Sequence, residues 1–151
     1  MKELQQLLAA SEVVAWHGSR TTPIEHLTFD SREVTAGSCF FAVEGTQVDG
    51  HRFIASAVER GAVAVVCRHL PEERSEAVAY VVVEDVQRVM AEMAAAFYDH
   101  PSRELKLVGV TGTNGKTTTA TLLYDLVRAL GYKAGLISTV IYKIDNRLIE
   151  S

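Results

Sequence analysis

The chain has 151 residues, of which 48% are hydrophobic and 23% are charged, and its formal net charge is −4. This composition is typical of a globular protein with a buried core and excludes a disordered chain. The acidic balance and the scattered basic residues argue against a nucleic-acid partner. No apolar run reaches the roughly 18 residues of a membrane span, and residues 1–10 lack the apolar stretch of a signal peptide, so we expect a cytoplasmic protein without a membrane partner.

The first part of the chain alternates between short helical and strand-like patterns. Leucines within residues 4–8 predict a short opening helix, and apolar residues within 24–29 and 39–43 predict two strands separated by a loop. Cys39 and Cys67 both lie in apolar runs, where a reduced thiol packed in the core is the ordinary outcome. The five histidines show no spacing typical of zinc ligands.

Two helices and two further strands follow. Residues 53–61 predict a helix that ends at a glycine, and residues 62–67 and 80–83 are β-branched runs that predict buried strands. Asp85 is placed to cap the next helix. That helix has one apolar face, made by Val86, Val89, Met90, Met93, Ala94 and Phe97. A stripe of this kind predicts core packing and not a binding surface.

The chain divides near Pro101, within a short linker at residues 101–104. Upstream, residues 1–100 predict a small α/β domain with its own core. Downstream, residues 105–151 predict the beginning of a second α/β domain, and no internal repeat or low-complexity segment is present.

Polar clusters in the first domain leave two interpretations open. Asp30-Ser31-Arg32 fits a turn in which side chains bond the local backbone, which composition favours, and it also fits a ligand site. Asp49-Gly50 is first of all a turn and a helix start. Thr46 and Gln47 just before it could hydrogen-bond a planar ring such as a pyrimidine, although any loop can carry such residues.

The most informative stretch is residues 108–118, which read Val-Gly-Val-Thr-Gly-Thr-Asn-Gly-Lys-Thr-Thr. An apolar run at 105–110 predicts a buried parallel strand, and the glycines at 112 and 115 let backbone N–H groups approach phosphate oxygens closely. Lys116 supplies a cation for the β- and γ-phosphates of ATP, and Thr117 can offer its hydroxyl to Mg²⁺. The pattern therefore predicts a nucleoside triphosphate site.

Val110 occupies the position of the first glycine in the general P-loop pattern, so only the later part of that pattern is present. The helix after the loop is predicted by Leu122, Leu123, Leu126, Val127 and Leu130. Gly131 is placed as its C-terminal cap, and residues 134–141 predict the next strand. A P-loop kinase or NTPase of another kind stays an alternative, but it requires an acid after a later strand, for which Asp145 is the sole nearby candidate in a poor setting.

Taken together, these motifs resemble the Mur ligases. In the first domain the resemblance rests on the order and spacing of Asp30-Ser31-Arg32, Gly37, Phe40-Phe41-Ala42-Val43, Gly45, Asp49-Gly50-His51, Phe53 and Gly61-Ala62. In the second it rests on Pro101-Ser102 and on residues 108–118, since the family's loop also lacks the first glycine. The resemblance implies a small N-terminal α/β domain that binds UDP, followed by the start of a P-loop α/β domain that binds ATP.

The resemblance also implies residue roles. The ATP phosphates would be held by Gly112, Thr113, Asn114, Gly115, Lys116, Thr117 and Thr118. Lys116 would act in catalysis and Thr117 would be a Mg²⁺ ligand. Ser31 would hold the uridine end of the substrate, Phe29 would flank the uracil, and Thr46, Gln47 and Val48 would lie beside it.

For function, the resemblance implies an ATP-dependent, amide-forming ligase of peptidoglycan synthesis. The best match is the ligase that joins a free third amino acid to UDP-N-acetylmuramoyl-L-alanyl-D-glutamate through an acyl phosphate. Two alternatives are the next, dipeptide-adding ligase of the pathway and a non-catalytic module that binds a UDP-sugar. Because Mur ligases typically have three domains and this sequence stops early in the second, we expect the chain alone to lack activity.

Overall fold

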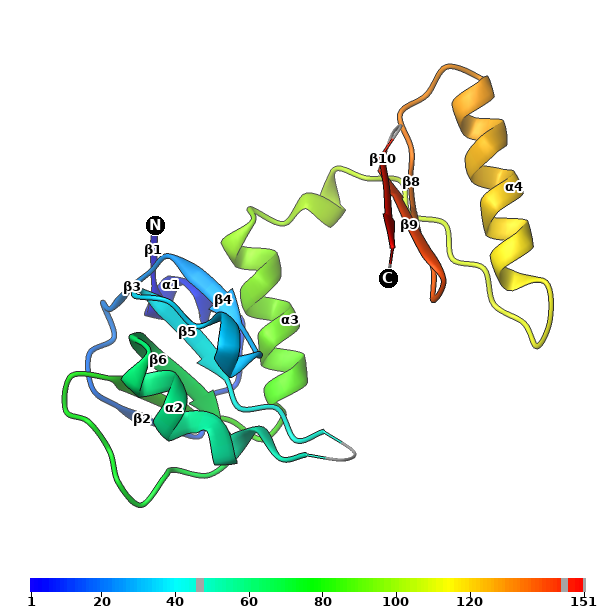
Figure 1. The fold of residues 1–151 in the computed structure, drawn as a ribbon. Helices are drawn as coiled ribbons and strands as arrows, with labels where there is room; N and C mark the ends of the chain where they lie inside the picture. The colour runs from blue at the N-terminus through cyan, green and yellow to red at the C-terminus, as the bar shows by residue number, and fades with distance from the viewer. Residues whose placement is uncertain (46–47, 145–146, 151) are drawn as a thin grey trace. The chain divides into compact units, whose positions relative to one another are not determined.

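The computed structural model describes residues 1–45, 48–144 and 147–150, and the chain falls into two compact units, Met1–Leu105 and Lys106–Ser151 (Figure 1). Each unit is described by itself. Within the described residues, no helix is long and apolar enough to cross a membrane.

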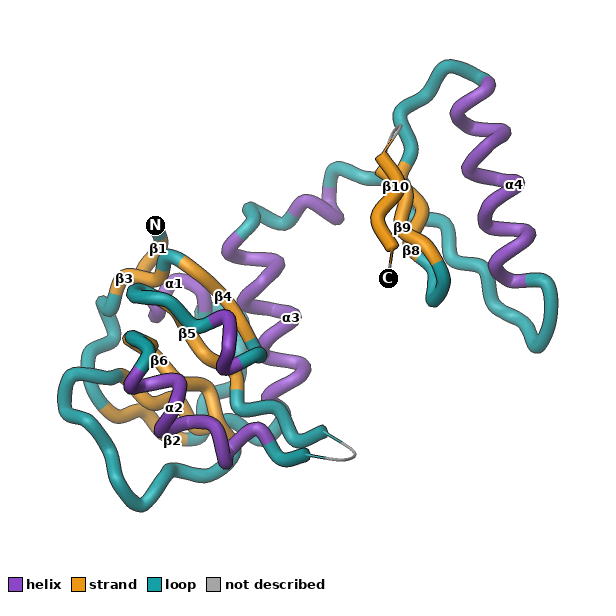
Figure 2. The backbone as a smooth tube through the Cα atoms, in the orientation of Figure 1, coloured by secondary structure: helices purple, strands orange, loops and turns teal. Residues whose placement is uncertain are grey.

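The first unit is built on a five-stranded sheet in the order β2-β7-β6-β5-β4. Figure 2 shows the strands in orange. Its strands are β2 (Ala15–His17), β4 (His26–Thr28), β5 (Ser38–Phe41), β6 (Ala62–Cys67) and β7 (Ala79–Val82). Strands β4 to β7 are parallel to their neighbours, whereas β2 is antiparallel to β7. A separate antiparallel pair joins β1 (Lys2–Glu3) to β3 (Pro23–Ile24).

Helices cover both faces of this sheet (Figure 1). The helices α1 (Leu4–Leu7) and α3 (Val86–Phe97) pack over one face, in a cluster that includes Phe41 and Val66. The helix α2 (Ile54–Glu59) packs over the other, in a cluster that includes Phe40 and Val65. Because successive strand residues point to opposite faces and both faces are buried, β6, β7 and the Cys39–Phe41 part of β5 are apolar at every position. This explains the uninterrupted apolar runs in the sequence and confirms the predicted strands over 39–43, 62–67 and 80–83.

The predicted helix details of this unit are confirmed. The Asp85 carboxylate caps α3 by accepting a hydrogen bond from the Arg88 backbone N–H at 2.9 Å. The predicted apolar face of α3 packs in the core, with Met93 fully buried. Cys39 and Cys67 are buried free thiols, and burial raises the pKa of Cys39 and raises that of Cys67 to about 11, which favours the protonated thiol over the nucleophilic thiolate.

The second unit contains one long helix and an antiparallel sheet in the order β10-β9-β8. The helix is α4 (Lys116–Ala129), and the strands are β8 (Gly135–Ile137), β9 (Ile141–Ile144) and β10 (Arg147–Glu150). Gly131 has a left-handed φ of 86°, which confirms the predicted cap after the helix.

Two strand predictions in this unit are wrong. Residues 106–110 form no strand, and Leu105, Leu107 and Val108 are 62%, 73% and 72% exposed. A strand needs a neighbour for its backbone hydrogen bonds, and no described strand pairs with this run. The strand predicted over 134–141 is only Gly135–Ile137, because a turn at Ser138 reverses the chain into β9. The Ser138 hydroxyl fixes that turn by accepting hydrogen bonds from the backbone N–H groups of Val140 and Ile141.

Candidate functional site

Polar segments gather at one edge of the first unit's sheet. Because β4, β5, β6 and β7 are parallel, the segments that follow them all begin at the carboxyl edge. These segments are the short 3₁₀ helix η1 (Ser31–Glu33), the turn at residues 44–49, Arg68–His69 and Glu84–Asp85. In open α/β sheets, ligands bind outside the carboxyl ends of the strands.

The segment after β4 holds one satisfied pair and two available groups. The Asp30 carboxylate accepts from the Arg32 backbone N–H at 2.9 Å and pairs with Arg32 Nη2 at 2.6 Å. These bonds from Arg32 lower the pKa of Asp30 from 3.8 to about 2. By contrast, Phe29 is 67% exposed, and the half-buried Ser31 makes no side-chain hydrogen bond to any described residue. Asp30 and Arg32 therefore build the turn, while Ser31 and Phe29 stay available to a ligand.

The segment after β5 folds back on itself. Glu44 and Asp49 pair across it, and the Gly45 N–H donates to the Val48 carbonyl at 3.0 Å. Val48 is 49% exposed, whereas the predicted site residues Thr46 and Gln47 lie outside the described residues. A Cβ on Gly50 would approach the Val43 carbonyl oxygen to 2.6 Å, so only glycine fits where the chain leaves this turn.

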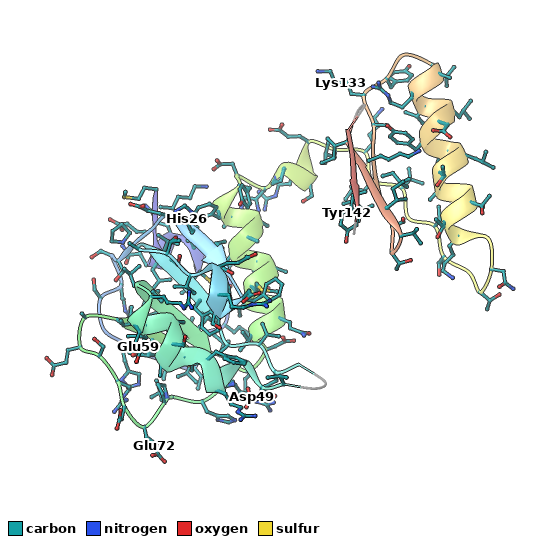
Figure 3. The ribbon with its side chains drawn as sticks, viewed as in Figure 1. His26, Asp49, Glu59, Glu72, Lys133 and Tyr142 are labelled. Carbon is teal, nitrogen blue, oxygen red and sulfur yellow. The ribbon has the colours of Figure 1, made fainter. Side chains whose placement is uncertain are left out.

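Asp49, labelled in Figure 3, begins a second short 3₁₀ helix, η2 (Gly50–Phe53). Its carboxylate accepts from the His51 backbone N–H at 2.9 Å and lies 2.7 Å from His51 Nδ1, and these bonds lower the pKa of Asp49. His51 Nε2 in turn accepts from the backbone N–H groups of Arg68 and His69. The Asp-Gly-His run predicts a turn here, but nothing in the run shows that the turn is bonded to the end of β6.

A pocket of about 290 Å³ also opens at this edge. Its charged lining consists of Glu44, Glu84, Asp85 and Arg68, and Arg68 Nη1 already pairs with Glu44 Oε2 at 3.2 Å. Three carboxylates against one guanidinium make the pocket acidic, so it does not suit a diphosphate.

In the second unit, the glycine-rich loop runs directly into α4. Gly115 is the N-cap residue, with a left-handed φ of 76°, and a Cβ there would meet no atom within 4 Å. Glycine is therefore favoured at this position because of its left-handed backbone conformation and not because of limited space for a side chain. The helix starts at Lys116 and turns its unpaired N–H groups toward the loop, which is the arrangement that binds phosphate.

The side chains of the loop are open to solvent. Thr113, Asn114, Lys116 and Thr118 are exposed, and Thr117 is half-buried in the first turn of α4. Lys116 Nζ donates to the carbonyl oxygens of Gly112 at 2.6 Å and Thr113 at 3.2 Å. The predicted ATP residues thus form one contiguous segment, made of the loop at 112–115 and the first turn of α4. Asp145, weighed as a later acid, lies outside the described residues.

Comparison with known families matches both units. Residues 23–98 match the family described as "Mur ligase family, catalytic domain", and residues 110–151 match "Mur ligase middle domain". The chain belongs to the Mur ligase family. The first Mur ligase match contains η1, the 44–49 turn and His51, and the second contains the whole glycine-rich loop.

Curated Mur ligases resemble the chain along almost its whole length. It is 48% identical over 149 residues to the "UDP-N-acetylmuramoyl-L-alanyl-D-glutamate--2,6-diaminopimelate ligase" of Bacteroides fragilis, an alignment that covers 99% of this chain and 31% of the relative. The ligase of the same name from Chlorobaculum tepidum is 46% identical, over 95% of this chain and 29% of the relative. The chain therefore spans about a third of the length of these relatives.

Solved Mur ligase structures share the fold. A "UDP-N-acetylmuramoyl-L-alanyl-D-glutamate--2, 6-diaminopimelate ligase" superposes with a TM-score of 0.72 at 26% identity, covering 98% of this chain and 30% of that one. MurF from Acinetobacter baumannii has a TM-score of 0.68 at 29% identity, covering 85% and 28%. MurF from Thermotoga maritima, solved in complex with ADP, has a TM-score of 0.54 at 31% identity, covering 72% and 24%.

Proposed function

We propose that this chain contains the uridine-binding site and the ATP-phosphate loop of a ligase that adds diaminopimelate to UDP-N-acetylmuramoyl-L-alanyl-D-glutamate. The observation that carries the proposal is the alignment at 48% identity over 99% of the chain with a relative of that name. Residues 1–100 are the UDP-binding domain in this proposal, residues 101–104 the linker, and residues 105–151 the start of the ATP-binding domain.

The geometry of the carboxyl edge supports the uridine assignment. The exposed ring of Phe29 offers a face for the uracil, and the Ser31 hydroxyl has both donor and acceptor capacity free. Val48 lies in the turn after the neighbouring parallel strand, at the same edge of the sheet. Thr46 and Gln47 keep their assigned place beside the uracil as part of the proposal.

The loop of the second unit supports the ATP assignment. A carboxylate is a poor acyl donor, so the D-glutamyl carboxylate first attacks the γ-phosphate of ATP, which releases ADP and gives an acyl phosphate. The amine of diaminopimelate then attacks the acyl carbon and expels phosphate. Lys116 would leave the carbonyl oxygens of Gly112 and Thr113 to neutralise the phosphates, and the N–H groups at the start of α4 would orient them.

Mg²⁺ fits this loop as a partner of the nucleotide. It retains several waters and binds through one or two protein oxygens together with substrate phosphates. Among the described residues, no group of three or more His, Cys, Asp and Glu side chains could hold a metal ion by itself. Thr117 is the residue that would offer one oxygen, and the ion would supply charge neutralisation at the phosphates.

The choice between neighbouring ligases rests on the curated relatives. Those from Bacteroides fragilis and Chlorobaculum tepidum carry the name of the diaminopimelate-adding enzyme, which supports addition of the third amino acid. The solved neighbours include the dipeptide-adding MurF as well, so fold similarity alone does not separate the two ligases. We keep MurF-type activity as the alternative for the whole protein.

A chimera tests the proposal. The corresponding third of the Bacteroides fragilis ligase is replaced by residues 1–151, and the tripeptide product is measured by mass spectrometry alongside phosphate release. We expect product with diaminopimelate and ATP, and none when Lys116→Ala is introduced. A folded chimera that binds UDP-N-acetylmuramoyl-L-alanyl-D-glutamate but forms no tripeptide would contradict the ligase assignment.

The 151 residues by themselves should act as a binding module. We propose that they bind the uridine end of the substrate, bind ATP weakly or not at all, and carry out no ligation, because Thr117 is the single Mg²⁺ ligand assigned beside the loop among residues 1–45, 48–144 and 147–150. Robust ATP turnover by the isolated chain would contradict this.

A further inference from the structure

We propose that His51 is a positioning residue for substrate binding: it ties the base of the 44–49 turn to the exit of β6 and thereby fixes the turn beside the uracil. This inference rests on the proposed function, because the turn is assigned to the uridine end of the substrate. The turn contains Val48 among its described residues, and its two sides are held together by the Glu44–Asp49 pairing and the Gly45 to Val48 hydrogen bond.

Both ring nitrogens of His51 are used, and each has a different role. Nδ1 lies 2.7 Å from Asp49 Oδ1, and a carboxylate can only accept, so Nδ1 carries the proton. Nε2 lies 3.0 Å from the Arg68 backbone nitrogen and 3.3 Å from that of His69, and both of these N–H groups donate, so Nε2 is the acceptor. The imidazole is therefore neutral in this arrangement, with its tautomer fixed by its partners.

These contacts close a ring of four residues. Asp49 pairs with Glu44 across the turn, Glu44 pairs with the Arg68 side chain, and the Arg68 backbone bonds His51, which returns to Asp49. Two ties thus connect the turn to the end of β6. One is the Glu44–Arg68 ion pair, and the other is the His51 imidazole.

The two ties differ in their exposure to water. The Glu44 and Arg68 side chains are 44% and 48% exposed, so solvent screens their attraction. The His51 side chain is only 15% exposed, although its partner Asp49 is 52% exposed, and its other two bonds are to backbone N–H groups that the chain itself holds in place. The charged and titratable groups that face the His51 imidazole are Asp49, Arg68 and His69. The centroid of the His69 imidazole lies 5.8 Å from that of the His51 imidazole. His51 should therefore contribute more to the position of the turn than the ion pair does.

Gly50 explains why the His51 imidazole lies so close to the sheet. Its N–H donates to the Val43 carbonyl at 2.9 Å, and this approach brings the start of η2 against the end of β5. With Gly50 fixed there, the His51 side chain reaches across to β6. The three residues of the Asp-Gly-His run thus act together. The aspartate orients the imidazole, the glycine lets the backbone approach Val43, and the histidine bonds the backbone at the end of β6.

The test uses the 151-residue chain, with UDP as the probe, and three substitutions around the ring. In His51→Asn the amide nitrogen can replace Nδ1 toward Asp49, but the side chain is too short to reach the N–H groups of Arg68 and His69. In His51→Gln the longer side chain can place its amide oxygen near Nε2 and restore that acceptor. Arg68→Ala removes the ion pair and keeps the backbone N–H. Lys2→Met, which removes an ion pair with Asp99 beyond the end of α3, controls for lost stability.

We expect His51→Asn to weaken UDP binding about tenfold, the equivalent of one to two lost hydrogen bonds, and His51→Gln to stay within about threefold of the unsubstituted chain. Arg68→Ala should change the UDP dissociation constant by less than about twofold because it removes an exposed pair, and so should Lys2→Met because Lys2 contacts Asp99 and the Ala96 carbonyl and not the turn. Unchanged binding in His51→Asn, or an equal loss in His51→Gln, would overturn the positioning role. So would an equal loss in Lys2→Met, because general destabilisation would then account for the effect.

Amide hydrogen exchange of the Gly45 N–H, measured without ligand, separates this inference from the proposed function. Faster exchange in His51→Asn, by about tenfold, and near-normal exchange in His51→Gln would support the tie between turn and β6. If the unsubstituted chain does not bind UDP, the proposed function fails, and the exchange result still decides whether His51 positions the turn. Unchanged exchange of Gly45 in His51→Asn overturns the inference in either case.

Discussion

The Lys116 ammonium group donates a hydrogen bond to the carbonyl oxygen of Gly112 at 2.6 Å, so the cation of the glycine-rich loop is held by the loop itself. A second bond reaches the Thr113 carbonyl at 3.2 Å. Phosphate oxygens would compete with these neutral carbonyls for the same cation. They would displace the carbonyls because hydrogen bonds to a charged acceptor are stronger.

Lys116→Ala should therefore separate the two ends of the substrate. In the chimeric ligase we expect it to abolish amide formation, while UDP affinity stays within about twofold because Ser31 and Phe29 belong to the other unit. Product formation and UDP binding are measured on the same preparation. Lys133→Ala, at an exposed lysine outside the loop, is the control and should leave ligation unchanged. Full ligation in Lys116→Ala would remove the loop from the mechanism.

The cap at the start of α3 gives a stability prediction. Asp85→Ala leaves the Arg88 N–H without its acceptor and should lower the free energy of unfolding by about 1 kcal/mol. For a unit of about this size, that loss lowers the melting temperature by roughly 4–8 °C. Thermal unfolding followed by circular dichroism measures it. Asp85→Ser keeps a capping oxygen and should recover most of the loss, so equal melting of Asp85→Ala and the unsubstituted chain would argue against the cap.

Asp30 gives a prediction about pH. Its hydrogen bonds from Arg32 lower the carboxyl pKa from 3.8 to about 2, so the contact favours the folded turn above the unfolded-state pKa and is lost as the pH falls toward about 2. A carbon-13 NMR titration of the Asp30 carboxyl group should show this low pKa. Arg32→Ala should raise it toward 3.8, whereas Arg52→Ala should not. A pKa near 3.8 in the unsubstituted chain would mean that the pair does not form in solution.

The junction between the units gives a prediction for limited proteolysis. Arg103 and Lys106 are both exposed and lie at the boundary between Met1–Leu105 and Lys106–Ser151. Trypsin should cut there first or in the tail beyond residue 144, and mass spectrometry should find a stable fragment of about the first hundred residues. A first cut at Arg60, between α2 and β6, would count against the independent folding of the first unit.

Most of the first unit could be predicted from the sequence, because its signals are local. The apolar face of α3 and the uninterrupted apolar runs of β6 and β7 show directly which residues are buried. Asp85 lies three residues before Arg88, whose N–H it caps, so the start of this helix could also be predicted. The same local reasoning located the loop around Lys116, since the loop and the start of α4 are consecutive in the chain.

The errors and omissions depend on contacts between distant residues. An apolar run at 105–110 predicts a strand, but pairing decides whether one forms, and no described strand lies beside it. The tie between His51 and Arg68 spans 17 positions, so the local Asp-Gly-His pattern shows a turn but not its partner. Ser31 and Phe29 could be named from the family resemblance, whereas their availability appears only once Asp30 and Arg32 are seen to satisfy each other.

Binding of the uridine end of the substrate by the first unit is the central claim, and a titration of the nitrogen-15-labelled chain tests it most directly. UDP-N-acetylmuramoyl-L-alanyl-D-glutamate and UDP should both shift the backbone amides of residues 29–32 and 48–49, and Ser31→Ala should weaken binding by about 1 kcal/mol, the usual contribution of one hydrogen bond. Ser102→Ala, at an exposed serine beyond α3, should bind normally. Equal shifts of the same amides with AMP, or shifts confined to other parts of the unit, would contradict the uridine site.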